Sequence, residues 1–269
     1  QALSAQNPSS NADMYNTATG YQAGKLVTTG IENTLIGGLG GDALTTGNYN
    51  TTLGYKALSS DTAGNRSVAI GREALLNQNF TSSTESYNVA VGYAAGLSVT
   101  TGKFSTLIGG LSGDAITTAL NSTAVGYNSL SLTTTGNYNS AFGSSALSLN
   151  STGASNTALG IDSLALNTTG SFNVAVGGNS LDANTTASNN TAVGYASLGA
   201  NTTGTGSTAV GAWAGDAITT GNYNTAIGYL ASGAVTTGAN NTSLGAFTLD
   251  AVTTAADNTA IGYGALTDN

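Results

Sequence analysis

The sequence contains no cysteine and no histidine, and it has one proline and one tryptophan. Without cysteine there is no disulfide framework and no thiolate, and without histidine there is no Ser-His-Asp triad and no imidazole zinc ligand. Charged residues make up only 7% of the chain, and 5 basic against 13 acidic residues leave a net charge of −8. We therefore expect no nucleic-acid partner, because such a surface neutralises phosphates with lysine and arginine.

Long apolar segments are also absent. No run of 18 or more apolar residues occurs, so we expect no membrane insertion. The N-terminal residues QALSAQNPSSNADMY show neither the charged region nor the apolar region of a signal peptide. A leader already removed, another export route and assembly inside a host cell all stay open.

What the chain does contain is a seventeen-residue repeat. The motif Asn-Thr-Ala-(Val/Ile/Leu)-Gly recurs fifteen times, with substitutions in most copies, and we call its invariant last residue the anchor glycine. Successive anchors lie 17 residues apart, except for one interval of 21 from Gly71 to Gly92. The anchors are Gly20, Gly37, Gly54, Gly71, Gly92, Gly109, Gly126, Gly143, Gly160, Gly177, Gly194, Gly211, Gly228, Gly245 and Gly262.

This period predicts an all-β fold, a parallel β-solenoid (β-roll) of about fifteen 17-residue coils. Thr, Val, Ile and Tyr favour its strands, while Gly, Asn and Ser favour the corners. We expect residues 1–15 to be an N-terminal tail or docking segment and 16–269 a single repeat domain. The four extra residues predict an insertion loop near 77–85.

The residue before each anchor is aliphatic or aromatic in every copy after the first, which predicts an inward strand position. The residue between it and the preceding Thr or Val is mostly Ala, which we expect to face outward and to let another surface approach. The predicted core is Ile36, Leu53, Ile70, Val91, Ile108, Val125, Phe142, Leu159, Val176, Val193, Val210, Ile227, Leu244 and Ile261.

Two further positions vary together. Where the fourth residue after the anchor is Gly or Ser, as at Gly113, the seventh is apolar, as at Ile116. Where the fourth is Leu, as at Leu164, the seventh is polar, as at Asn167. Only the coil with Leu249 and Val252 keeps both bulky residues. We infer that the two positions compete for one interior volume, because a close-packed core accepts one bulky group there.

Tyrosine directly follows the anchor in alternate coils over much of the chain, as at Tyr195 and Tyr229. We expect each ring to lean over the small residue of a neighbouring coil, or the column to face a partner chain.

Few residues suggest a ligand site. The segment 37–45, GGLGGDALT, matches a calcium nonapeptide, so Asp42, Asp114 and Asp216 are weak calcium candidates. A solvated turn aspartate is the alternative for each, since the three lie in distant coils. We predict no metal, no cofactor and no enzymatic activity, because no coil combines clustered acids with stacking aromatics and Trp213 stands alone.

One asparagine recurs at the same place in four successive coils: Asn150, Asn167, Asn184 and Asn201. It predicts a structural ladder in which side-chain amides bond along the stack. Each also begins an N-x-(S/T) sequon, so glycosylation is the alternative.

The units SVAIG at 67–71, NVAVG at 88–92 and 173–177, and STAVG at 122–126 and 207–211 resemble the head repeat of trimeric autotransporter adhesins. Similar repeats occur in phage tail fibres and bacterial surface fibre proteins. The resemblance implies a left-handed parallel β-roll and a homotrimer. The adhesin unit is usually fourteen residues long, whereas this one is seventeen. Because the stalk and membrane-anchor parts of that family do not occur in this sequence, we expect a rod and a trimer rather than an autotransporter.

These observations favour a structural and adhesive fibre protein: a cell-surface adhesin, a self-assembling filament or a phage tail-fibre shaft. Its expected partners are itself, as a homotrimer or an end-to-end filament, and host-surface glycans or proteins. Its expected location is extracellular, on a cell surface or on a virion tail. The alternative is an ice-binding β-solenoid with a Thr-rich face. The recurrent adjacent Thr-Thr pair argues against it, because its members point to opposite sides.

Overall fold

The computed structural model describes residues 1–7 and 13–267. These residues contain no helix, and the chain is an all-β parallel solenoid, as the repeat predicts. Two compact units, Gln1–Thr135 and Gly136–Asn269, are described separately below. The prediction of a single repeat domain over 16–269 stays a prediction.

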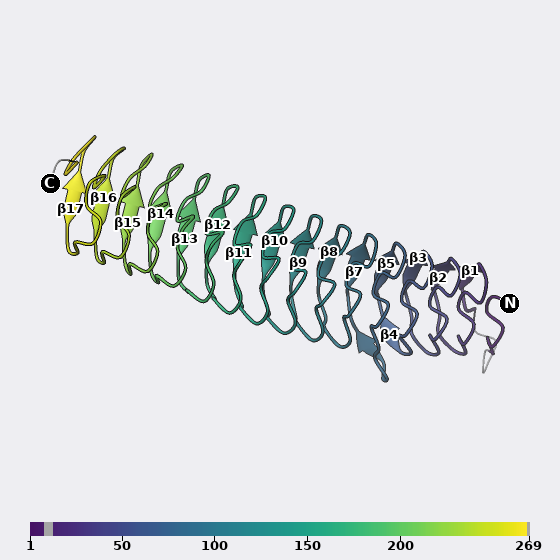
Figure 1. Cartoon of the computed structure of the whole chain (residues 1–269). Helices are drawn as coiled ribbons and strands as arrows, with labels where there is room; N and C mark the ends of the chain where they lie inside the picture. Colours follow the sequence, from purple (N-terminus) through teal and green to yellow (C-terminus); the bar gives the residue numbers. More distant parts are fainter. Residues whose placement is uncertain (8–12, 268–269) are drawn as a thin grey trace. The chain divides into compact units, whose positions relative to one another are not determined.

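In the first unit, each coil contributes one short strand that pairs in parallel with the strand of the next coil (Figure 1). The register is strict, since Thr34 lies opposite Thr51 one repeat later. The strands are β1 (Thr17–Thr19), β2 (Thr34–Ile36), β3 (Thr51–Leu53), β5 (Val68–Ile70), β7 (Val89–Val91), β8 (Thr106–Ile108) and β9 (Thr123–Val125).

The second unit repeats this arrangement, with Thr208 opposite Thr225. Equivalent side chains therefore stack at the spacing of hydrogen-bonded strands, about 4.8 Å. Its strands are β10 (Ser140–Phe142), β11 (Thr157–Leu159), β12 (Val174–Val176), β13 (Thr191–Val193), β14 (Thr208–Val210), β15 (Thr225–Ile227), β16 (Thr242–Leu244) and β17 (Thr259–Ile261).

The backbones of successive coils touch at the anchor glycines. Gly160 has φ +141°, and a Cβ added to it would stand 2.5 Å from the carbonyl oxygen of Gly177. No other residue fits without moving one coil away from the next. The repeat of the anchor thus follows from backbone contact.

The predicted orientation of the strands is wrong. The middle residue of each strand points inward: Ala158 is fully buried, whereas Leu159 beside it is 50% exposed. The interior beneath each strand is so narrow that Ala fills it in most coils. Most of the larger buried side chains are the Leu, Ile or Val four or seven residues after the anchor, which fill the rest of the core. Every residue of the predicted core is partly or largely exposed: Ile36, Leu53, Ile70, Val91, Ile108, Val125, Phe142, Leu159, Val176, Val193, Val210, Ile227, Leu244 and Ile261.

The predicted competition for interior volume matches the packing. Leu164 and Ile116, from the two kinds of coil, are both fully buried. A Cβ added to Gly113 would stand 2.8 Å from Cδ1 of Ile116, so a leucine there has no room. In the coil that keeps both residues, Leu249 is fully buried and Val252 is only half-buried. In this coil Leu249 fills the shared interior volume, and Val252 lies partly outside it.

Residues 1–7 bond to the coil that follows them, in the segment for which the sequence left a tail and a docking segment open. The amides of Leu3 and Ala5 donate to the carbonyls of Ala23 and Lys25, at 3.1 and 3.2 Å. The same bonds join the equivalent residues of later coils, and they make this segment part of a coil. The rest of the predicted segment includes residues 8–12, which lie outside the described residues.

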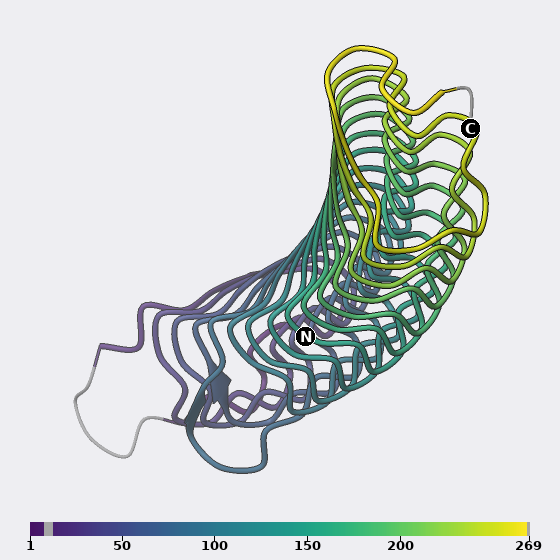
Figure 2. The ribbon, with the colours of Figure 1, turned by 90° about the vertical axis from the view of Figure 1, so that its left-hand side faces the viewer.

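The insertion lies where the lengthened interval predicts it. Strands β4 (Gly64–Asn65) and β6 (Thr84–Glu85) pair in parallel beneath it. The intervening residues 81–83 are exposed. Figure 2 shows this loop projecting beyond the outline of neighbouring coils of the first unit.

Candidate interaction surfaces

The first and third residues of the short strands form an outward surface in each unit, which we call the strand face. Its third-residue column is aliphatic apart from Thr19 and Phe142, with Leu159, Ile227 and Leu244 all exposed. Its first-residue column is Thr, Ser or Val, half-buried or exposed. No charged residue occurs in either column. The strand face is thus a row of hydroxyl and methyl groups beside a row of aliphatic groups.

The adjacent Thr-Thr pairs divide between two roles. The first threonine donates its hydroxyl to the carbonyl of the equivalent residue one coil later, as Thr202 does to Thr219 at 3.2 Å. The second, such as Thr203, is exposed. The pair therefore points to two sides, as predicted, and its first member holds successive coils together.

Aromatic rings form a connected row in the second unit, which we call the aromatic ladder. It consists of Tyr195, Trp213, Tyr229, Phe247 and Tyr263. Successive ring centroids lie 5.3 to 5.8 Å apart, with interplanar angles of 72° to 88°. These are edge-to-face contacts, the favoured geometry of aromatic pairs. The sequence pattern of tyrosines alone missed the ladder, because Trp213 and Phe247 stand one residue later in their coils than the tyrosines do.

The tyrosines also lean over small neighbours, as predicted. Cδ2 of Tyr195 lies 3.6 Å from the place that a Cβ on Gly178 would occupy, and Cδ2 of Tyr55 lies 3.5 Å from that place on Gly38. The small residues of intervening coils therefore leave room for the rings.

A second aromatic row, in the first unit, includes a cation. The Arg66 guanidinium lies 4.6 Å from the ring centroid of Tyr49 and 5.7 Å from that of Tyr87. Tyr87 stacks in turn on Phe104, at 6.1 Å. Arg66 also donates to Glu85 of the insertion at 2.5 Å. This row fixes the insertion against the coils on both sides of it.

The four predicted ladder asparagines do bond to one another. Nδ2 of Asn184 donates to Oδ1 of Asn167, and the bonds from Asn167 to Asn150 and from Asn201 to Asn184 are alike, at 2.8 to 3.2 Å. All four side chains are fully buried. Glycan attachment at these positions is therefore incompatible with the folded chain. Oδ1 of Asn201 has no hydrogen-bond partner, because the next coil places Ile218 there.

The structure contains a second, longer asparagine ladder that was not predicted from the sequence. The residue four before the anchor is Asn or Ser in every coil, and it is buried in most. Asn173 accepts a bond on Oδ1 from the amide of Asn190, at 3.0 Å, and its Nδ2 donates to Ala187 at 2.9 Å. The Asn that begins the repeated motif is the sequence feature from which this ladder could have been predicted.

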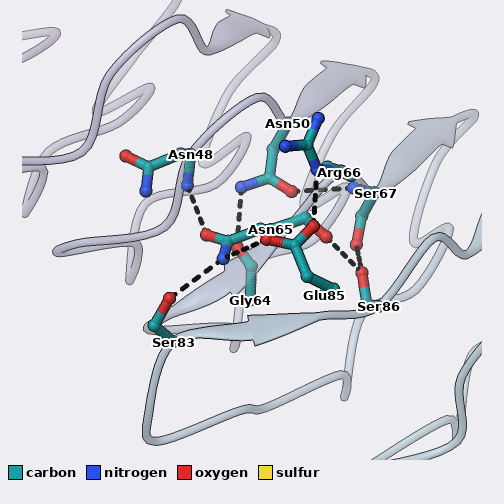
Figure 3. A network of polar contacts seen from close by, with 9 residues as sticks. All are labelled: Asn48, Asn50, Gly64, Asn65, Arg66, Ser67, Ser83, Glu85 and Ser86. Carbon is teal, nitrogen blue, oxygen red and sulfur yellow. Dashed lines mark hydrogen bonds and ion pairs between the residues drawn. The ribbon is translucent and has the colours of Figure 1, made fainter.

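A polar network lies beneath the insertion (Figure 3). Nδ2 of Asn65 donates to Ser83 at 3.1 Å, and the Ser67 and Ser86 hydroxyls lie 2.6 Å apart. The side chain of Asn50 accepts from the amide of Ser67 at 2.9 Å. These bonds join the insertion to two earlier coils of the first unit.

Asp61 is the fully buried acid of this region. It accepts hydrogen bonds from the amides of Gly64 and Phe80 and from Nε2 of Gln78, at 2.7 to 3.1 Å. Burial raises the pKa of its carboxyl, and these bonds lower the pKa by a smaller amount. The carboxylate thus organises the backbone at the start of the insertion.

The three calcium candidates are not brought together. Asp42 accepts the hydroxyl of Ser59 at 2.6 Å. The carboxyls of Asp114 and Asp216 each bury one oxygen that has no hydrogen-bond partner, and burial raises the pKa of both. Among the described residues, no group of three or more acids forms a cation cage.

Over those same residues, no helix is long and apolar enough to cross a membrane. No protein-family model matches the sequence, and no curated protein matches it significantly. The resemblance to adhesin head repeats therefore stays a prediction.

Proposed function

We propose that this chain is a structural and adhesive fibre protein whose rods assemble side by side through the strand face. The observation that carries the proposal is the outward apolar column of half-buried and exposed side chains, which runs from Phe142 to Ile261 in the second unit and from Ile36 to Val125 in the first. A contiguous apolar surface on a soluble protein marks an interaction site.

The occupant we propose for the strand face is a second copy of the same chain. Both columns repeat with the coils and carry no charge. Two such faces can therefore pack in register without desolvating an ion, and the uncharged surface favours close side-by-side contact. A homotrimer, with the strand faces around a common axis, covers all three copies. With this role we propose the extracellular, cell-surface or virion location that the sequence led us to expect.

The test is the mass in solution, measured by light scattering after gel filtration. A trimer has a mass of about 79 kDa, three times the 26.3 kDa of one chain. Ile227→Asp should shift the mass toward that of the monomer, because a carboxylate desolvated between aliphatic rows is costly. Thr220→Asp, on another exposed face, is the matched control and should keep the wild-type mass. A monomeric wild-type chain overturns the proposal.

Ice binding is a second candidate, supported by the outward threonines of the strand face. Thr208 and Val210 point outward from one strand, and Thr225 and Ile227 repeat the pair one coil later. Inhibition of ice recrystallisation by the monomer, lost in Thr225→Tyr and kept in Thr220→Tyr, would support this function over the fibre.

A further inference from the structure

The second unit has an unusual charge: residues 136–269 contain no lysine or arginine, while six of the thirteen acids lie there. Asp216 and Asp250 lie in two of the five coils that carry the aromatic ladder. An anionic partner, such as a nucleic acid or a sulfated glycan, is repelled by such a surface. A partner that covers the ladder is therefore neutral or cationic, and not an anion.

The rings of the ladder are exposed and already ordered. Tyr195 is 53% exposed and Tyr229 45%, and each has an edge-to-face contact with Trp213. Ala212 and Ala246 occupy the tyrosine position in the two intervening coils. In those coils the rings of Trp213 and Phe247, one residue later, lie between the tyrosines. Because the rings already hold one another in place, these side chains lose little conformational entropy when a ligand stacks on them.

The spacing of the tyrosines along the coil axis indicates the repeat length of a ligand that could bind to them. Tyr195, Tyr229 and Tyr263 occupy the same position in every second coil. Strand spacing places them about 9.6 Å apart along the coil axis. This is close to the disaccharide repeat of an extended β-1,4-linked polysaccharide. Its sugar rings also expose apolar C–H faces, which suit the negative faces of aromatic rings.

We propose that the aromatic ladder binds a neutral β-1,4-linked polysaccharide that lies along the coil axis. The ring stack supplies the apolar contacts, and the exposed tyrosine hydroxyls supply hydrogen bonds. This deepens the adhesive role proposed above and names the class of its partner. The binding site itself does not require the strand face.

The test uses cellohexaose and chitohexaose as probes and Trp213, the one tryptophan of the chain, as the reporter. Either sugar should shift the emission of Trp213 as it covers the ring. Tyr229→Ala should weaken binding by about two- to tenfold, the effect of losing one ring contact. Tyr229→Phe should keep most of the affinity.

Tyr223→Ala is the matched control, because Tyr223 is an exposed tyrosine in the same unit outside the ladder. It should bind as the wild type does. Unchanged emission of Trp213 with both sugars, or equal binding by Tyr229→Ala and Tyr223→Ala, would overturn the inference. Circular dichroism excludes unfolding of either variant.

Light scattering separates this inference from the fibre proposal. Sugar binding by a chain that stays monomeric would support the ladder and overturn side-by-side assembly. A trimer that binds neither sugar would support side-by-side assembly and overturn the proposed sugar site on the ladder.

Discussion

Nδ2 of Asn167 lies 2.8 Å from Oδ1 of Asn150, one coil earlier, and both side chains are fully buried. In each of the four ladder coils the same side-chain amide also donates a hydrogen bond to the backbone carbonyl three residues later, as Asn167 does to Gly170 at 3.0 Å. Each rung thus closes its own turn and joins it to the preceding coil. A buried amide with partners on both sides stabilises the stack, whereas a missing rung leaves its neighbours unpaired.

Removal of one rung should therefore cost more than one hydrogen bond. Asn184→Ala leaves Oδ1 of Asn167 and Nδ2 of Asn201 without that partner. We expect the free energy of unfolding to fall by about 2–4 kcal/mol, since each unpaired buried group costs about 1–3 kcal/mol. Urea titration measures the change. Thr186→Ala, an exposed change in the same coil, should stay within about 0.5 kcal/mol of the wild type. Equal effects of the two variants would contradict the ladder's role.

One coil type should be convertible into the other. Gly215→Leu alone overfills the interior, because its Cβ would stand 3.0 Å from Cδ1 of Ile218. Ile218→Asn alone leaves a cavity. Together they rebuild the leucine-type coil and give Oδ1 of Asn201 a partner. A double-mutant cycle should show a favourable coupling of about 2 kcal/mol, within the range for residues in contact. Additive effects would show that the two positions do not share a volume.

The anchor glycines should not tolerate alanine. In Gly211, with φ +135°, a Cβ would stand 2.5 Å from the carbonyl oxygen of Gly228. We expect Gly211→Ala to lower the free energy of unfolding by about 3 kcal/mol or more, through strain at a positive φ and separation of two coils. Gly178→Ala is the matched control. There the nearest atoms lie 3.4 to 3.6 Å away, and we expect a change below about 1 kcal/mol. If both variants unfold alike, backbone contact is not the reason for the repeat.

Stability should fall as the pH rises from acid toward neutral. Burial raises the pKa of Asp61 above the ordinary value of 3.8, and it moves the pKa values of Asp114, Asp182 and Asp216 in the same direction. The folded chain thus keeps these protons to a higher pH than the unfolded chain. Their stabilising effect is complete below 3.8 and is lost as the pH passes the raised values.

Urea titrations at a series of pH values from 3.5 upward, in about half-unit steps, measure this slope. Asp61→Asn should flatten it, because the variant has no carboxyl to titrate at the buried position. A stability that rises with pH over this range would contradict the assignment.

The repeat alone predicted the solenoid, its parallel register and the insertion, because a fixed period leaves few other folds. It also predicted that Gly113 and Ile116 share a volume and that Asn150 begins a ladder, since both follow from comparing equivalent positions. These inferences required no knowledge of which way a side chain points.

The orientation of the strands could not be predicted in this way. Alternation shows that Ala158 and Leu159 face opposite sides, but it does not say which side is inside. Hydrophobicity favoured Leu159, and the narrow interior accepts Ala158. The aromatic ladder was missed for a related reason, because Trp213 contacts Tyr229 from a different position of its coil.

The central claim is that the outward strand faces of different chains meet. The chain has no cysteine, so any thiol cross-link between introduced cysteines reports a contact between chains. With a short bis-maleimide, Ile227→Cys should give covalent dimers in high yield. Thr220→Cys should react with a monofunctional maleimide but give few dimers. Equal cross-linking of the two variants, or none at residue 227, would contradict the account.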